Sequence, residues 1–137
     1  MEFHNTTDIP IELVKCVIAF AAQDGIMLKS IKLRNKAEGK ECRGNWGMYY
    51  HDRRITLTIP TKIPDCGITT KLVHCGKYIT IRNRIEFVVA VLAHELRHAW
   101  QMQVKGLEYL NACSAAKEFD AEMYEYLILE QWRDLVK

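Results

Sequence analysis

Residues 84–106 read RIEFVVAVLAHELRHAWQMQVKG, a stretch that is compatible with helix almost throughout. Apolar residues recur along it at helical spacing, at Ile85, Val88, Val89, Leu92, Leu96 and Ala99. One side of this helix is therefore expected to face the core and to need a packing partner. Asn83, followed three residues later by Glu86, is typical of a helix N-cap, and Gly106 is expected to end the helix.

One helix is expected before this stretch and one after it. The first should begin near Thr7–Asp8, tolerate Pro10 in its first turn and stop at Gly25. Its apolar face is predicted at Ile11, Val14, Ile18 and Ala22. The last helix should run from about Ser114, a favourable N-cap residue, to near Leu135.

Short strands are expected between the first two helices, in IMLKSIKLRN (26–35), WGMYYHDRRITLTIP (46–60) and KYITIR (77–82). The second segment predicts a hairpin, because Ile55, Leu57 and Ile59 alternate after a polar turn. Residues 35–45 are turn-rich and are expected to be a surface loop, and residues 60–77 a long excursion.

Length and composition are those of one ordinary soluble domain. The chain has 137 residues, of which 49% are hydrophobic and 26% charged. No apolar run reaches the ~18 residues that span a bilayer, and the N-terminus lacks the features of a signal peptide. The order of elements predicts a single α+β domain over residues 1–137: an N-terminal helix, a small mainly antiparallel sheet and two late helices. A cytoplasmic protein without a membrane partner is expected.

The charges are unevenly distributed along the chain. Residues 1–84 carry 14 Lys/Arg against 8 Asp/Glu, a balance of +6, whereas residues 85–137 carry 5 against 9, a balance of −4. A basic half can attract nucleic acid, but these charges form no run, so a solvated surface is the favoured interpretation.

The five cysteines have no close CxxC spacing, so reduced thiols are the favoured interpretation. Cys66 and Cys75, with His74 beside them and Cys42 further away, are the alternative: a second metal site or a redox bridge. Their nine-residue separation matches no common zinc knuckle, which disfavours that alternative.

The helix at 84–105 carries a His-Glu-x-x-His motif at His94, Glu95 and His98. Positions i and i+4 share one face, so both imidazoles can bring a ring nitrogen to a single metal ion. Glu95 is rotated by about 100° from His94 and can reach a water held by that ion, whose pKa zinc lowers to ~7. Random placement produces the motif in about 1–2% of such chains. Its place within a helix and its apolar neighbours favour a metal site over two ordinary histidines.

The third ligand that a catalytic zinc usually has does not come from a later histidine, because none follows His98. A metzincin-type motif is excluded as well, since Gln101 and Val104 stand where it needs Gly and His. The last helix carries acidic residues on one face, at Glu118, Glu122 and Glu125. Such a stripe is either a solvated acidic face or the source of the missing ligand, whereas Asp120 points elsewhere.

HELRH (94–98), followed twenty residues later by EFDAE (118–122), resembles the gluzincins, zinc peptidases with HExxH on one helix and a Glu ligand on the next. The resemblance implies that Glu118 is the third zinc ligand and that Glu122 takes the place of a carboxylate that orients His94. The family usually has Asp there, so the longer Glu122 is a departure. The small size and element order look like the minigluzincins and the related ImmA/IrrE-type and SprT-like domains. SprT-like proteins usually have a third histidine, so the gluzincin-like branch is preferred.

The resemblance also implies a strand that receives substrate and a residue that stabilises the oxyanion. In such domains an extended substrate adds to a sheet edge; RITLTIP (54–60) is the candidate, with an ordinary sheet strand as the equal alternative. Candidates for the oxyanion residue are Tyr109, Tyr124, Tyr126 and His74. Arg97 and Trp100 are interpreted as structural residues, a cation at or near the surface and a core aromatic.

The predicted function is that of a zinc metalloendopeptidase that hydrolyses a peptide or protein substrate with Glu95 as general base. Two alternatives stay open, a non-catalytic zinc-binding regulatory or scaffold module and a nucleic-acid-associated SprT-like protease. The first would keep zinc without cleaving peptides. The second would bind DNA in a salt-dependent manner.

Overall fold

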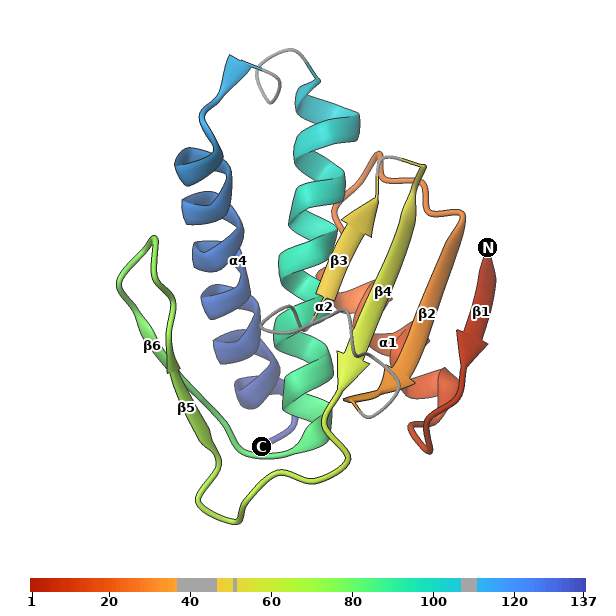
Figure 1. The fold of residues 1–137 in the computed structure, drawn as a ribbon, viewed down its shortest axis with the longest axis vertical. Helices are drawn as coiled ribbons and strands as arrows, with labels where there is room; N and C mark the ends of the chain where they lie inside the picture. Colours follow the sequence, from red (N-terminus) through yellow and green to blue (C-terminus); the bar gives the residue numbers. More distant parts are fainter. Residues whose placement is uncertain (37–46, 51, 107–110) are drawn as a thin grey trace.

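The computed structural model describes residues 1–36, 47–50, 52–106 and 111–137 of the chain (Figure 1). The helices are α1 (Ile11–Ala21), α2 (Arg84–Trp100), its π-helical continuation η2 (Gln101–Lys105) and α4 (Ser114–Leu135). The strands are β1 (Glu2–Asn5), β2 (Ser30–Asn35), β3 (Gly47–Tyr50), β4 (Arg54–Ile59), β5 (Ile68–Lys71) and β6 (Tyr78–Ile81). The fold is α+β, as predicted, and most of the loop expected at 35–45 lies outside the described residues.

The larger sheet has four strands in the order β1-β2-β4-β3. Strands β1, β2 and β4 run parallel, and β3 pairs antiparallel with β4. The prediction of a mainly antiparallel sheet is therefore wrong for this sheet. Two chain connections explain the difference. The helix α1 crosses from the unpredicted β1 to the parallel β2, which a short hairpin could not do, and β3 comes between β2 and β4 in the sequence but pairs on the far side of β4. The smaller sheet is the antiparallel hairpin β5-β6, and β5 lies within the segment predicted to be an excursion.

Alternate side chains of β2 and β4 form the centre of the core, and α1 and α2 lie along that face of the sheet (Figure 1). In these two strands the side chains with no exposed surface are Ile31, Leu33, Ile55, Leu57 and Ile59. The antiparallel pairing of β3 with β4 confirms the predicted hairpin, and the burial of Ile55, Leu57 and Ile59 confirms its alternation. On α1 the buried residues are Val14, Val17 and Ala21, so the apolar face is rotated from the predicted one.

The helix α1 was expected to begin near Thr7–Asp8, but it begins at Ile11. Side chains hold the preceding residues in a turn instead. Thr7 N donates to Asn5 Oδ1 at 2.9 Å, and Ile9 N donates to Thr7 Oγ1 at 3.2 Å. These bonds satisfy backbone groups that the first turn of a longer helix would otherwise use.

The cap predicted for α2 is confirmed, because Asn83 Oδ1 accepts a hydrogen bond from Glu86 N at 2.8 Å. After Trp100 the backbone widens into η2, and Gly106, with φ of 55°, ends the helical stretch as predicted. The helix α4 has the predicted bounds, although Cys113, without a side-chain cap bond, takes the N-cap position expected of Ser114.

Helices α2 and α4 lie side by side, and the β5-β6 hairpin lies beside α4 (Figure 1). Arg133 near the end of α4 donates to Glu86 at the start of α2, with N–O distances of 2.9 and 3.2 Å. The same guanidinium donates to the carbonyl of Thr80 in β6. One side chain thus ties both helices to the hairpin.

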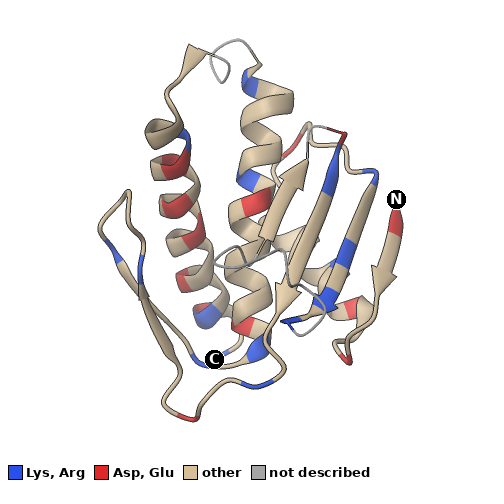
Figure 2. Ribbon diagram, viewed as in Figure 1, with Lys and Arg blue, Asp and Glu red and all other residues tan. Residues whose placement is uncertain are grey.

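The uneven charge of the sequence is reflected only in part in the fold, because α4 also carries Lys117 and Arg133. Lys and Arg residues lie on β2 and β4, whereas acidic residues recur along α4 (Figure 2). In the described part of the chain, no helix combines the length and apolarity that crossing a membrane requires.

Truncation of the core should identify the strands that carry the stability. Leu57→Ala removes a fully buried side chain, so the free energy of unfolding should fall by about 2–5 kcal/mol. Leu127→Ala, at a half-exposed position of α4, is the matched control and should cost less than about 1 kcal/mol. Urea unfolding measures both, and equal losses would contradict the core as described.

Candidate metal centre

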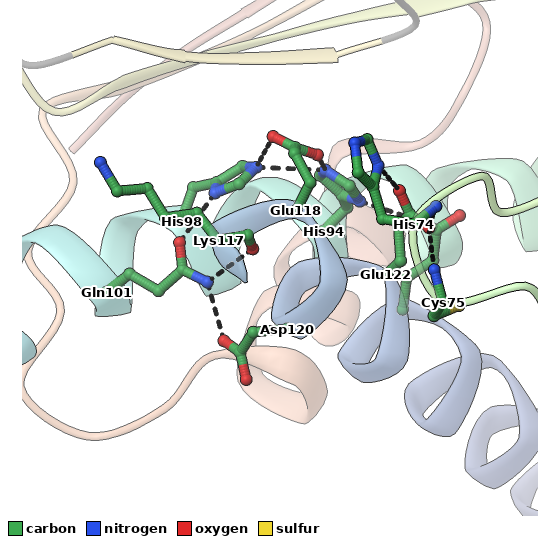
Figure 3. Close-up of polar contacts among 10 residues, drawn as sticks. His74, Cys75, His94, His98, Gln101, Lys117, Glu118, Asp120 and Glu122 are labelled. Carbon is green, nitrogen blue, oxygen red and sulfur yellow. Dashed lines mark hydrogen bonds and ion pairs between the residues drawn. The ribbon is translucent and has the colours of Figure 1, made fainter. Parts of the chain in front are cut away.

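Three side chains from two helices meet at one point, His94 and His98 of α2 and Glu118 of α4 (Figure 3). His94 Nε2 lies 3.2 Å from His98 Nε2 and 3.1 Å from Glu118 Oε2. His98 Nε2 lies 3.0 Å from Glu118 Oε1. Ligand atoms bound at ~2.0–2.2 Å to one tetrahedral zinc ion lie ~3.3 Å from each other. The three residues named from the sequence are thus spaced as ligands of a single ion.

A glutamate other than the expected one orients His94. Glu125 Oε1 lies 2.8 Å from His94 Nδ1, so this ring nitrogen is engaged while Nε2 faces the cluster. The assignment of this role to Glu122 is wrong. Glu125 lies nearly two turns beyond Glu118 on the same face of α4, which brings it level with His94 on the neighbouring helix.

His98 is oriented by Gln101, which was notable in the sequence only as a departure from the metzincin motif. Gln101 Oε1 lies 2.9 Å from His98 Nδ1. Its amide nitrogen donates to Lys117 O at 3.0 Å and to Asp120 Oδ2 at 2.7 Å (Figure 3). Asp120 in turn accepts two hydrogen bonds from Arg97, at 2.7 and 3.0 Å. The place of Gln101, three residues after His98 at the start of η2, is the only sequence signal for its role.

Glu122 instead holds the turn between β5 and β6. One carboxylate oxygen, Oε1, accepts from the backbone N of His74 at 2.8 Å and of Cys75 at 3.1 Å. The other, Oε2, lies 2.6 Å from His74 Nδ1. The His74 ring consequently lies beside Glu118 (Figure 3), and His74, Glu118 and Glu122 form a second group of metal-ligating side chains.

The expected general base, Glu95, lines the same cleft as His94 and Glu118, in a cavity of about 340 Å³. Its side chain is almost fully buried, and burial raises the pKa of this carboxyl. The edge strand β3 approaches it closely at Gly47. A Cβ at Gly47 would lie 2.6 Å from Val91 Cγ1 and 3.1 Å from Glu95 Cγ, so glycine permits the approach.

The electrostatics of the cluster favour positive charge at its centre. Burial disfavours the charged form of His94, but hydrogen bonds to Glu118 and Glu125 outweigh burial and raise the pKa of His94 to about 10. Burial likewise opposes the charged form of His98, and its bond to Glu118 nevertheless raises the His98 pKa. Hydrogen bonds from both histidines hold the pKa of Glu118 far below its usual range. Protons or a metal cation can supply this positive charge.

The candidates for the oxyanion residue lie at different places relative to the cluster of His94, His98 and Glu118. The hydroxyl of Tyr124 donates to the carbonyl of Ala21, and its ring lies under Arg97, so these contacts hold it apart from the cluster of His94, His98 and Glu118. Tyr126 packs under Lys77, and Tyr109 lies outside the described residues. Among the described residues, His74 is the oxyanion candidate that lies at the cluster.

Three smaller expectations are corrected or narrowed. RITLTIP corresponds to β4, which pairs on both sides and has no free edge; the edge beside the cleft belongs to β3. Trp100 is half-buried under the guanidinium of Arg97, 3.9 Å from its ring centre, and is not in the core. Cys66 and Cys75 are free thiols, and neither joins a metal-ligating group among the described residues.

No known protein family, curated protein or solved structure matches this chain. The function is therefore inferred from the site itself.

The exchange of roles between the two glutamates is testable by zinc affinity. Glu125→Ala leaves His94 Nδ1 without its partner, so the affinity of the tightest site should fall by about 10–100-fold. Glu122→Gln retains an acceptor for the hairpin turn and should leave that affinity nearly unchanged. Competition with a chelator of known affinity measures both. A larger loss in Glu122→Gln than in Glu125→Ala would restore the original assignment.

Proposed function

We propose that this chain is a zinc-dependent metallopeptidase, with zinc held by His94, His98 and Glu118. The observation that carries the proposal is the set of ligand atoms 3.0–3.2 Å apart, next to a buried carboxylate in the same cleft. Two imidazoles and one carboxylate are a ligand set of catalytic zinc, which leaves a fourth position for water or substrate. A structural zinc site would normally have four protein ligands instead.

Each residue of the centre has a definite task in hydrolysis. Zinc, when bound, lowers the pKa of a water molecule and polarises the peptide carbonyl. Glu95 accepts the proton of that water and passes it to the leaving amine; its burial keeps its pKa raised, which suits both tasks. Glu125 and Gln101 keep Nε2 of the two histidines directed at the ion.

The cleft suits an extended peptide substrate. One wall is the outer edge of β3, which no other described strand pairs and to which a peptide can add as a further strand. The opposite wall comes from the β5-β6 hairpin and the floor from α2, and their apolar side chains in the cleft are Ile68, Leu72, Val73, Ile81, Phe87 and Val91. These surfaces favour a peptide or protein substrate with an apolar side chain near the cleaved bond.

The compartment proposed for this activity is the cytoplasm. The described cysteines, Cys16, Cys66, Cys75 and Cys113, are free thiols, as is usual for proteins of a reducing compartment.

Two substitutions separate metal binding from hydrolysis. Glu95→Gln should retain zinc but lower kcat by at least about 100-fold, because the amide cannot accept the proton. His98→Ala removes a ligand and should lose the zinc. Glu130→Gln, at an exposed position of α4, is the control and should match the wild type. Elemental analysis and digestion of a peptide library provide the two measurements.

The outcomes also distinguish the alternative functions. Zinc without cleavage by the wild type would indicate a regulatory or scaffold module, and salt-dependent DNA binding would support the nucleic-acid-associated protease. Protein that neither contains zinc nor takes it up would refute the proposal.

Zinc affinity should depend on pH in a defined direction. The pKa of His94 is about 10, so this imidazole is protonated at pH 7 and must lose its proton when zinc binds. Raising the pH from 6 to 8 should therefore strengthen binding by roughly tenfold per unit for each proton displaced. Calorimetry in buffers of different ionisation enthalpy measures the proton release. Binding that releases no proton at pH 7 would contradict the electrostatics of the cluster.

A further inference from the structure

The group formed by His74, Glu118 and Glu122 lies next to the proposed zinc ligands and shares Glu118 with them. Each of the three residues presents one ligand atom within 4.8 Å of the other two. Ligand atoms on one divalent ion bound at ~2.0–2.2 Å lie up to ~4 Å apart. A movement of less than an ångström at each side chain therefore suffices. His74 can make it, because its side chain is 39% exposed at the tip of a hairpin.

The geometry at Glu122 prepares this group for a ligand. Its Oε1 is held by two backbone N–H groups, which fixes the carboxylate while Oε2 faces His74. The carboxylate of Glu118 has two oxygens, and both now contact histidine nitrogens. Since one oxygen is enough for the zinc ion, the other can serve as a bridge to a second ion. Metal ions bridged in this way lie ~3.5–4 Å apart.

The charge of the side chains that line the cleft also favours the binding of a second cation. Its described lining contains four carboxylates, of Glu95, Glu118, Glu122 and Glu125, against a single Lys/Arg side chain, that of Lys71. When all four carboxylates are ionised, one divalent ion offsets two of the four negative charges and leaves two. Three of these carboxylates, those of Glu95, Glu122 and Glu125, are buried, where uncompensated negative charge is costly. A second divalent cation would make the lining neutral apart from Lys71.

We propose that His74, Glu118 and Glu122 form a second divalent-cation site, so that the cleft holds two ions bridged by Glu118. One imidazole and two carboxylates suit zinc, and they also suit manganese. The proposal rests on the zinc site described above, because the two sites share Glu118. The role of His74 is then to bind metal from the hairpin, which couples the position of β5-β6 to the ion beside the reacting groups.

Metal stoichiometry tests the proposal directly. The protein is stripped with a chelator, titrated with Zn²⁺ alone, and examined by native mass spectrometry and elemental analysis. The wild type should bind about two zinc ions, and His74→Ala about one, with its tightest site unchanged. His4→Ala removes another exposed imidazole, on β1 and outside the cleft, and should still bind about two. Glu122→Gln keeps an oxygen for the backbone donors but loses the anionic ligand, and should bind about one, so the test does not depend on the folding of a single variant.

The possible results are separable. One zinc ion in the wild type would support the peptidase site and overturn the second site. Two ions in both the wild type and His74→Ala would place the second ion elsewhere and also overturn the proposal. Loss of the second ion in His4→Ala alone would identify it as adventitious surface binding. No bound zinc in the wild type would refute both sites, the proposed peptidase included.

Discussion

The packing of α2 against α4 is the constraint on which the rest of the structure depends. Polar contacts run along this interface in antiparallel order: Glu86 with Arg133, His94 with Glu125, His98 with Glu118, and Gln101 with the backbone of Lys117. Each step along α2 away from its cap is matched by a step back along α4. The apolar residues between these contacts, such as Leu92, Leu96 and Leu129, are completely or almost completely buried. The helices therefore cannot slide without losing both kinds of contact, and this register decides which carboxylate meets which imidazole.

Because of this register, the glutamates on one face of α4 contact different partners. Glu118 and Glu125 face α2, where they contact the two histidines. Glu122 lies between them in the sequence but faces the turn of the β5-β6 hairpin. Glu122 contacts the hairpin, and not His94, because two backbone N–H groups and an imidazole of the hairpin turn surround its carboxylate. A buried carboxylate is stabilised best where several donors are already directed at it.

Much of the fold and the centre of the site could be predicted from local pattern. The N-cap at Asn83, the hairpin of β3 and β4 and the bounds of α4 depend on residues close in sequence, so their signals are contained in short windows. The elements that were not predicted depend instead on residues far away in the sequence. The short β1 and β5 have little pattern of their own, and they are strands because β2 and β6 offer them backbone partners. The parallel pair β1-β2 could not be predicted without β1, and the parallel pair β2-β4 depends on β3 pairing on the far side of β4.

The sequence by itself determined the spacing within each element. The i, i+4 spacing of His94 and His98 places both imidazoles on one face of any α-helix, and the absence of later histidines makes carboxylates the candidates for a third ligand. Tertiary structure decided everything that joins two elements. It selected Glu125 to orient His94, Gln101 to orient His98 through the π-helical turn, and β3 as the edge beside Glu95. It also brought His74 across to α4, 48 residues away from Glu122 in sequence. The physical reason is that helical periodicity fixes directions around one axis, whereas the register between helices is set by the packing of the whole core.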